Sequence, residues 1–600
     1  MYKFFSAFHH TGLAIRLVWD TSRSLTLIMA ISTVVAGVTP AAIASVGGLF
    51  VDAVANLLRQ SEMDFSSFRQ EILKYVLIEL GLVLLLTGTQ RLNIVCQSIL
   101  RALLGNKINV MILEKALTLE LAHFEDSEYY DKLIRARREA SSRPLSLIIK
   151  TFDLLRDTIA LVTIGVFLLQ FSVWAALLLL ISGIPAFIAE TKFSGEAFRI
   201  QKRRSAERRL QIYLEMVLTR EDGVKEVKLF RLGKHFLKRY IEIFNRIYRE
   251  DRSLVVRRAF WGYILGLLAS IALYFSYGWV GFAAVAGTIT IGQMTMYIAQ
   301  FRLGQNAVTT SLTAINGMYE DNLYLSNLSE YLNHEIPEAS GDSLHGPCPD
   351  GGIRFENVSF RYPGSETPAL DNVSIHIKPG ESLAIVGENG SGKTTLIKLL
   401  TRLYKPSSGR ILFEGLDLEQ WDIKALRNKI GVIFQDFNRY QLVVGENIGI
   451  GEIRDSGNEE RIGEAAKKGM AHSFIKDLPD TYNTQLGSWF KDGKELSGGQ
   501  WQKIALSRVF MKEKADILVL DEPTAALDAK AEAEIFAHFR ELTDNRISII
   551  ISHRFSTVRM ADHIIVFKKG KVAEQGSHLE LINHKGIYAT LFELQAQGYR

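Results

Sequence analysis

The sequence predicts a multidomain membrane protein in which an all-α domain of six membrane-spanning helices precedes an α/β domain. The 600 residues are 48% hydrophobic and 22% charged, a composition too apolar for a disordered chain. Long apolar runs are confined to residues 1–320, whereas residues 350–600 show the short apolar strands and helical patterns of an α/β fold. The chain therefore combines a membrane-embedded part with a water-exposed part.

Six apolar stretches are each close to the 20 or so residues that cross about 30 Å of hydrocarbon. They cover residues 24–48, 73–97, 149–169, 172–190, 259–284 and 289–317. The first stretch is followed by others and is not a cleaved signal peptide.

Lysine and arginine are concentrated in the two long connections, residues 98–148 and 191–258. The positive-inside rule places these connections in the cytoplasm, and six crossings then place both termini there. Nucleic-acid binding is a poor explanation for the basic residues, because they flank membrane spans. Both connections continue the helical pattern as cytoplasmic extensions, and breaks near residues 124–127 and 221–223 are places for short helices across the hairpin tips.

Domain boundaries follow from composition. Residues 1–340 form the predicted transmembrane domain, residues 341–352 are a linker rich in glycine and proline, and residues 353–600 form the α/β domain. Two cysteines, Cys96 and Cys348, exclude a disulfide framework or a cysteine-based zinc site.

A phosphate-binding loop follows a short apolar run at residues 383–386, with the sequence GENGSGKT at 387–394. This is a P-loop between a strand and a helix, in which backbone N–H groups close around phosphate oxygens and Lys393 adds a cation. Thr394 supplies a hydroxyl for Mg²⁺. The residues expected to bind nucleotide here are Gly387, Asn389, Gly390, Ser391, Gly392, Lys393, Thr394 and Thr395.

A second strand, at residues 517–520, ends in Asp521 and Glu522, the Walker B pattern. We expect Asp521 to hold Mg²⁺ and Glu522 to polarise the attacking water, because phosphoryl transfer requires mainly positioning and charge neutralisation. The second half is therefore predicted to be a P-loop ATPase domain.

The sequence LSGGQ at residues 496–500 resembles the signature motif of ATP-binding cassette (ABC) proteins. Six spans followed by one cassette resemble the half-exporters of that family. The resemblance implies that Tyr362 stacks on adenine, that Gln435 contacts Mg²⁺ and the attacking water, and that His553 senses the γ-phosphate. It further implies that nucleotide contacts come from Ser497, Gly498, Gly499, Gln500 and Asp528.

One chain carries one P-loop and one signature motif, so the resemblance implies a dimer that binds two ATP at its interface. The intact motifs favour a homodimer with two active sites. A heterodimer in which this chain is the competent half remains open.

Local variants bear on the transported substrate. Ser488 stands where many exporters have glutamate, and the residues after Gln435 and Gln500 also differ, which resembles bacterial exporters of lanthionine peptides. Export of a peptide or amphiphile across the bacterial inner membrane is therefore predicted. A lipid flippase or hydrophobic-drug exporter is the alternative, and a non-transport ATPase or gate is a third class.

The sixth stretch is unusually polar, with Arg302, Gln305, Thr309 and Thr313 spaced to share one helical face. Such residues line a substrate cavity or form hydrogen bonds between helices, and the sequence leaves both explanations open.

Overall fold

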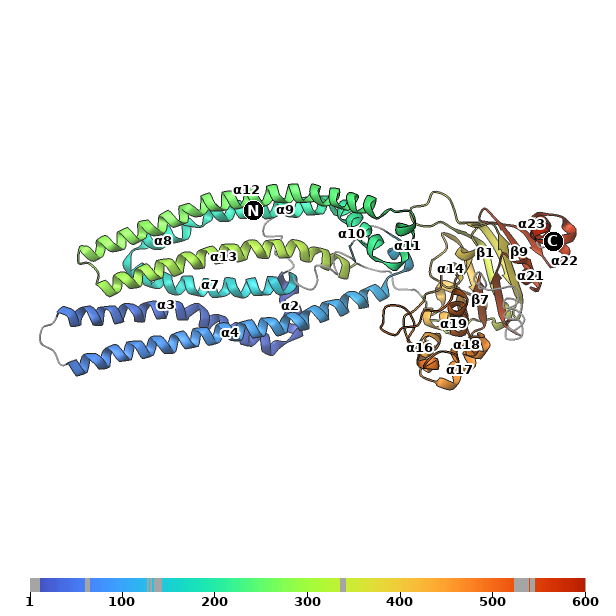
Figure 1. The fold of residues 1–600 in the computed structure, drawn as a ribbon, viewed down its shortest axis with the longest axis horizontal. Coiled ribbons are helices and arrows are strands. Elements are labelled where there is room, and N and C mark those ends of the chain that lie inside the picture. The colour runs from blue at the N-terminus through green and yellow to red at the C-terminus, as the bar shows by residue number, and fades with distance from the viewer. Residues whose placement is uncertain are drawn as a thin grey trace. The chain divides into compact units, whose positions relative to one another are not determined.

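The structure, a computed structural model, describes residues 11–59, 65–126, 129, 132–133, 143–334, 341–522, 539 and 545–598. The chain forms two compact units, one of residues 1–118 and 128–334 and one of residues 119–127 and 335–600. Figure 1 shows that the first unit is helical and that the second contains the β-sheets.

Long helices dominate the first unit. They are α2 (Thr11–Thr21), α3 (Arg23–Arg59), α4 (Phe65–Thr118), α7 (Arg143–Phe171), α8 (Val173–Ser182), α9 (Ile184–Arg203), α10 (Ser205–Thr219), α11 (Glu221–Leu229), α12 (Gly233–Val285) and α13 (Ile291–Leu332). Helix α13 packs against α7, and α12 runs beside α9 (Figure 1).

The six predicted spans coincide with helices of this unit. Within the described residues, three helices are long and apolar enough to cross a membrane by length and composition: α3, α4 and α12. The stretch at 172–190 is divided between α8 and α9 at Gly183, just before Pro185. Proline lacks an N–H group and clashes with the preceding turn, so a new helix starts there. Spans through α7, α8–α9 and α13 stay a prediction.

Close backbone approach joins α3 to the start of α13. A Cβ atom on Gly292 would lie 2.1 Å from the carbonyl oxygen of Gly48, so only glycine fits at this crossing. The carboxylate of Asp52 accepts hydrogen bonds from Gly292 N at 2.7 Å and from Thr290 Oγ1 at 2.6 Å. Asp52 thus supplies a negative charge at the N-terminus of α13, where the helix dipole is positive.

Polar contacts join α7 to α13. Lys150 Nζ lies 2.7 Å from Asp321 Oδ2, and the Asp321 side chain is fully buried. Nearer the middle of α7, Arg156 pairs with Asp157, whose other carboxylate oxygen accepts a hydrogen bond from the hydroxyl of Thr310. Charged side chains of α7 are therefore used in contacts with α13.

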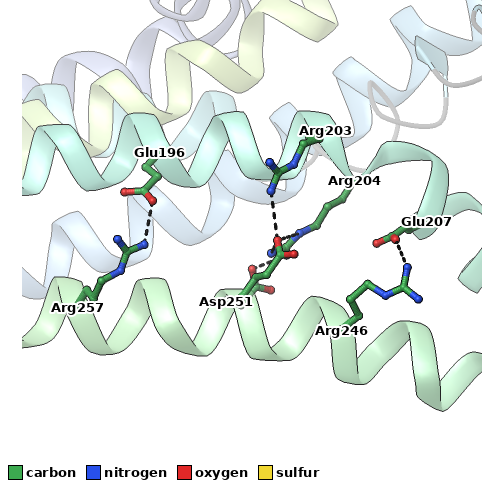
Figure 2. A network of polar contacts seen from close by, with 8 residues as sticks. Glu196, Arg203, Arg204, Glu207, Arg246, Asp251 and Arg257 are labelled. Atoms are coloured by element: carbon green, nitrogen blue, oxygen red, sulfur yellow. Dashed lines mark hydrogen bonds and ion pairs between the residues drawn. The ribbon is translucent and has the colours of Figure 1, made fainter.

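Ion pairs join the α9–α10 segment to α12 (Figure 2). Arg204 lies at the break between α9 and α10, and its side chain is 10% exposed. Its hydrogen bonds lower the pKa of Glu250. The pairs are Glu190–Arg258, Glu196–Arg257, Arg203–Glu250, Arg204–Glu250, Arg204–Asp251 and Glu207–Arg246.

Two sheets form the second unit. The six-stranded sheet has the order β10-β9-β3-β8-β7-β6, and the four-stranded antiparallel sheet has the order β2-β1-β4-β5. The strands are β1 (Ile353–Phe360), β2 (Leu370–Ile377), β3 (Ser382–Gly387), β4 (Ser408–Phe413), β5 (Leu416–Asp417), β6 (Ile430–Ile433), β7 (Ile517–Asp521), β8 (Ile547–Ile551), β9 (His563–Lys568) and β10 (Lys571–Gly576).

Strands β3, β9, β8, β7 and β6 pair in parallel, and β10 pairs antiparallel to β9 at the edge. Every residue of β7 and β8 is buried, which explains why both sequences are apolar except for Asp521 and Ser548. Because the strands run in parallel, the carboxyl ends of β3, β7 and β8 lie at one edge of the sheet, where the site is built.

Helices cover these sheets. They are α14 (Lys393–Leu400), α15 (Ile423–Asn428), α16 (Val444–Gly449), α17 (Glu459–Lys468), α18 (His472–Ile475), α19 (Gly498–Phe510), α21 (Phe555–Val558), α22 (His578–His584) and α23 (Ile587–Gly598), with short 3₁₀ turns at Pro349–Gly351, Leu418–Gln420, Ile453–Asp455 and Thr481–Asn483.

Two further segments belong to the second unit. A short helix, α5 (Leu121–Glu125), joins it although α4 belongs to the first unit. Part of the predicted linker is bonded to this unit as well. Ser343 N donates to Gln420 O, and Cys348 N donates to Glu414 O.

Candidate active site

The phosphate loop lies between β3 and α14 and depends on glycine. Gly387 has φ +154° and Gly392 has φ +108°, conformations that side-chain-bearing residues rarely adopt. A Cβ atom would lie 2.3 Å from Phe567 O at Gly387 and 2.7 Å from Ala369 O at Gly392. The loop can therefore turn back tightly only with glycine at both positions.

Polar groups of this loop suit an anion. Lys393 Nζ donates to Gly387 O at 2.8 Å and to Glu388 O at 3.0 Å, so the amine lies over the loop. Burial lowers the pKa of Lys393, and the charges of Glu522 and Asp521 oppose that shift. The buried hydroxyl of Ser391 has no hydrogen-bond partner in the described part of the chain. An added phosphate would supply the partner that the Ser391 hydroxyl lacks.

Hard oxygen ligands lie at the start of α14 and the end of β7. Thr394 Oγ1 donates to Asp521 Oδ2 at 2.8 Å, which brings a hydroxyl and a carboxylate to one point. Asp521 is 1% exposed, and burial raises its pKa to about 6. Mg²⁺ prefers oxygen ligands of this kind and commonly binds a protein through one or two of them together with phosphate oxygens. The two residues therefore fit the predicted metal site.

Three predicted catalytic residues meet at Glu522. Gln435 Nε2 donates to Glu522 Oε2 at 2.6 Å, and His553 Nε2 contacts Glu522 Oε1. Glu522 has φ +49°, and its N–H donates to Ile551 O at 2.9 Å. The end of β8 thus holds the backbone of Glu522 in a conformation that costs free energy for a residue other than glycine. The arrangement presents one carboxylate to an amide and an imidazole.

Tyr362 lies beside the phosphate loop, after β1. Its hydroxyl lies 3.1 Å from Thr395 Oγ1, and its side chain is partly exposed. The ring meets Phe360 and Tyr404 edge to face, with centroids 4.9 Å and 5.4 Å away. The aromatic residue predicted to stack on adenine is therefore fixed to the helix that follows the phosphate loop. Thr395, predicted to contact nucleotide, is 6% exposed and bonds to this tyrosine.

The signature residues form the start of α19. Ser497 is the N-cap, its hydroxyl accepts from Gln500 N at 3.3 Å, and Gln500 Oε1 accepts from Ser497 N at 2.9 Å. This capping box starts α19, and its first turn includes Gly498 and Gly499. The N-terminus of a helix carries positive charge from the helix dipole and therefore suits an anion. Among the described contacts, these residues bond to one another and to none of the phosphate-loop side chains.

The structure thus brings together Lys393, Thr394, Asp521, Glu522, Gln435 and His553, and it keeps the signature residues separate from them. Asn389 and Gly390 are exposed at the tip of the loop. Asp528, predicted to contact nucleotide, lies outside the described residues.

Two residues that support this site escaped the sequence analysis. Gln595 on α23 donates to His553 O at 2.6 Å and accepts from Phe555 N at 3.1 Å, so it holds both sides of the histidine loop. Arg508 on α19 donates to Asn438 O at 2.7 Å and to both oxygens of Asn447, joining the signature helix to the segment after Gln435. Burial lowers the pKa of Arg508 to about 10.

A phosphate-binding loop beside candidate metal-binding and water-activating residues, in a chain with helices long and apolar enough to cross a membrane, points to an ATP-driven membrane protein. Residues 26–308 match the family model of the ABC transporter transmembrane region, and residues 370–525 match the family model described as ABC transporter. The chain belongs to the ABC transporter family, and it hydrolyses ATP to drive transport.

Several relatives align over most of the chain. The subtilin transport ATP-binding protein of Bacillus subtilis is 34% identical over 494 residues, covering 82% of this chain and 80% of that protein. The nisin transport ATP-binding protein of Lactococcus lactis subsp. lactis is 31% identical, with 82% of each chain covered. The ATP-dependent lipid A-core flippase of Escherichia coli (strain K12) is 32% identical, with 72% of this chain and 73% of that protein covered.

A solved structure supports the fold. A bacterial Atm1-family ABC exporter with ATP bound superposes with a TM-score of 0.81 at 22% identity, covering 95% of this chain and 99% of that one. The predicted fold class, a helical transmembrane domain followed by an α/β nucleotide-binding domain, is confirmed.

Proposed function

We propose that the chain is one half of a homodimer that exports a peptide from the cytoplasm by alternating access. The dimer lies in the bacterial inner membrane, with both termini and the ATPase domain in the cytoplasm. Two relatives named for transport of peptide products, subtilin and nisin, support a peptide substrate. The lipid A-core flippase supports the second candidate, movement of a lipid.

The observation that supports a polar substrate is the exposed polar face of α13. Arg302, Asn306, Thr309 and Thr313 recur at helical spacing and are all exposed in the single chain. Arg302 follows the first residue of α13 by three turns, roughly 16 Å, which is near the middle of a hydrocarbon layer about 30 Å thick. Among the described residues, Arg302 takes part in no ion pair. A guanidinium at that depth avoids lipid, so this face borders a hydrated path or another chain.

At the ATP site, we assign Glu522 as the group that polarises the attacking water, with Gln435 and His553 positioning it. Thr394, Asp521 and Gln435 would hold Mg²⁺. When bound, this ion would neutralise negative charge on the phosphates. Lys393 and the glycine-rich loop bind the phosphates, and Tyr362 binds the adenine. Ser497 to Gln500 and Asp528 complete the site of the second subunit.

The experiment that tests the substrate class measures ATP hydrolysis by the full-length protein in nanodiscs. A panel of cationic, acidic and lanthionine-containing peptides is compared with a panel of lipids and hydrophobic drugs. We expect a peptide to stimulate hydrolysis, and we expect Arg302→Met to raise the peptide concentration needed for half-maximal stimulation. Arg101→Met, which removes an exposed arginine of α4, is the matched control.

Stimulation by lipids alone would favour the flippase. Solute flux in the absence of ATP would contradict a coupled exporter and favour a gate.

A further inference from the structure

The short helix α5 packs beside the tyrosine assigned to adenine. Leu121 and Ala122 contact the apolar core of the second unit, which includes Phe360 and Tyr404. Tyr362 packs against the same core. The docking surface of α5 and the predicted adenine platform therefore border the same apolar core.

A carboxylate at the end of α5 makes the polar contacts of this docking. Tyr404, which is 6% exposed, donates its hydroxyl to Glu125 Oε2. Lys398 Nζ lies 3.6 Å from Glu125 Oε1. Burial, together with the hydrogen bond to Glu125, raises the pKa of Tyr404, so the hydroxyl stays protonated and serves as the donor.

Lys398 links this carboxylate to Tyr362. Its ammonium lies 5.3 Å from the centroid of the Tyr362 ring and 5.7 Å from that of Tyr404, distances at which a cation is attracted by an aromatic ring. Lys398 belongs to α14, as does Thr395, which contacts the Tyr362 hydroxyl. The orientation of the Tyr362 ring thus depends on two groups of α14, and Glu125 holds one of them in place.

We propose that Glu125 is a positioning residue for adenine binding: it holds Lys398 against Tyr362 and thereby couples the docking of α5 to occupation of the base site. The inference rests on the proposed role of Tyr362. Coupling between two sites is reciprocal, so a base that binds better when α5 is docked strengthens that docking by the same factor. The base is common to ATP and ADP. Both nucleotides should therefore hold α5, whereas a phosphate chain without a base should not.

The first test separates KM from kcat for ATP hydrolysis by the full-length protein. We expect Glu125→Gln to raise the KM for ATP about fivefold, at the lower end of typical couplings between sites, and to change kcat less than twofold. The matched control is Glu120→Gln, which removes the same charge from the exposed residue before α5 and should leave both constants unchanged. A fall in kcat at constant KM would overturn the proposal.

A double mutant identifies the route. If Glu125 acts through the ring, Glu125→Gln should have no further effect on KM in a Tyr362→Leu background. Additive effects would overturn the proposal. If Tyr362→Leu leaves nucleotide affinity unchanged, the role of Tyr362 itself is wrong. If Tyr362→Leu weakens ATP binding and Glu125→Gln does not, only the coupling through Glu125 is wrong.

The second test follows amide hydrogen exchange in residues 119–126 of full-length protein carrying Glu522→Gln. We expect Mg-ADP and Mg-ATP to slow exchange in this segment, and we expect inorganic tripolyphosphate to leave it unchanged. Equal protection by tripolyphosphate, or none by ADP, would overturn the proposal.

Discussion

The two ends of the predicted ATP site differ in how far one chain completes them. At the phosphate end, Thr394 bonds to Asp521, and Glu522 bonds to both Gln435 and His553. At the signature end, the side chains of Ser497 and Gln500 bond to each other's backbone N–H and, among the described contacts, to no group of the phosphate loop. The phosphate end thus holds its predicted catalytic groups in contact with one another, whereas the signature end presents a capped helix N-terminus that contacts none of them.

The groups predicted to hydrolyse ATP are therefore assembled within one chain, whereas the signature motif is formed separately from them. The phosphate end contains the residues predicted for catalysis, because parallel pairing places the carboxyl ends of β3, β7 and β8 at one edge of the sheet. The signature end contains a positive helix terminus whose capping side chains, among the described contacts, bond to no group of the phosphate loop. The comparison predicts that defects at the two ends behave differently when two chains are mixed.

The largest expected effect comes from Glu522→Gln. The amide retains an oxygen for Gln435 but cannot take a proton from water, so we expect ATP hydrolysis to fall on the order of 100-fold or more while ATP still binds. Steady-state hydrolysis and filter binding of labelled ATP measure the two properties. Glu356→Gln, which removes the partly exposed partner of Arg410, is the control and should retain full activity. Hydrolysis at the parental rate would show that Glu522 is not the base.

A mixed dimer tests whether the two ends meet across subunits. Lys393→Ala and Ser497→Ala chains are co-expressed with different tags and purified as the mixed dimer. One composite site then receives both defects and the other receives neither, so we expect measurable hydrolysis where each variant alone is nearly inactive.

The matched control carries both substitutions in one chain paired with an unaltered chain. In that dimer each site has one defect, and we expect activity far below that of the mixed dimer. Equal activities in the two arrangements would argue against a shared site.

The smallest effect is expected at Gln595, which supports the phosphate end from outside. Gln595→Leu removes two hydrogen bonds to the loop that carries His553. The loss of about 1 kcal/mol corresponds to roughly a fivefold lower kcat, with the KM for ATP little changed. Gln575→Leu, on the exposed face of β10, provides the comparison variant. An unchanged kcat would mean that the loop keeps its position without α23.

Much of the site could be predicted from the sequence because its parts are local patterns. A short buried strand followed by a glycine-rich loop and a helix start fixes where Lys393 and Thr394 lie, and an apolar strand ending in Asp521 is equally recognisable. The meeting of Gln435, Glu522 and His553 was expected only from the family resemblance. Their contact results from the pairing of β7 with β8 and β6.

The missed residues have no local pattern. Gln595 looks like any polar residue on a helix, and its importance comes from a loop 42 residues away. Arg508 looks like a favourable charge in the last turn of α19. Tyr404 and Glu125 are 279 residues apart, so only the folded chain brings them together. The division of the stretch 172–190 at Gly183 does have a local signal, Pro185, and α13 also approaches Gly183 closely.

The ion pairs between α9–α10 and α12 fix the longitudinal alignment of this hairpin. Their polarity reverses along its length, because acids of α9 and α10 face arginines of α12 on either side of Arg204, which faces Glu250 and Asp251 (Figure 2). A slip of one turn in one direction would bring Arg246 to the place of Glu250, beside Arg204. Like charges would then meet, so the two helices resist sliding past each other. We therefore expect α9, α10 and α12 to move together. A displacement at one end of the hairpin would then also displace α11, which connects α10 to α12.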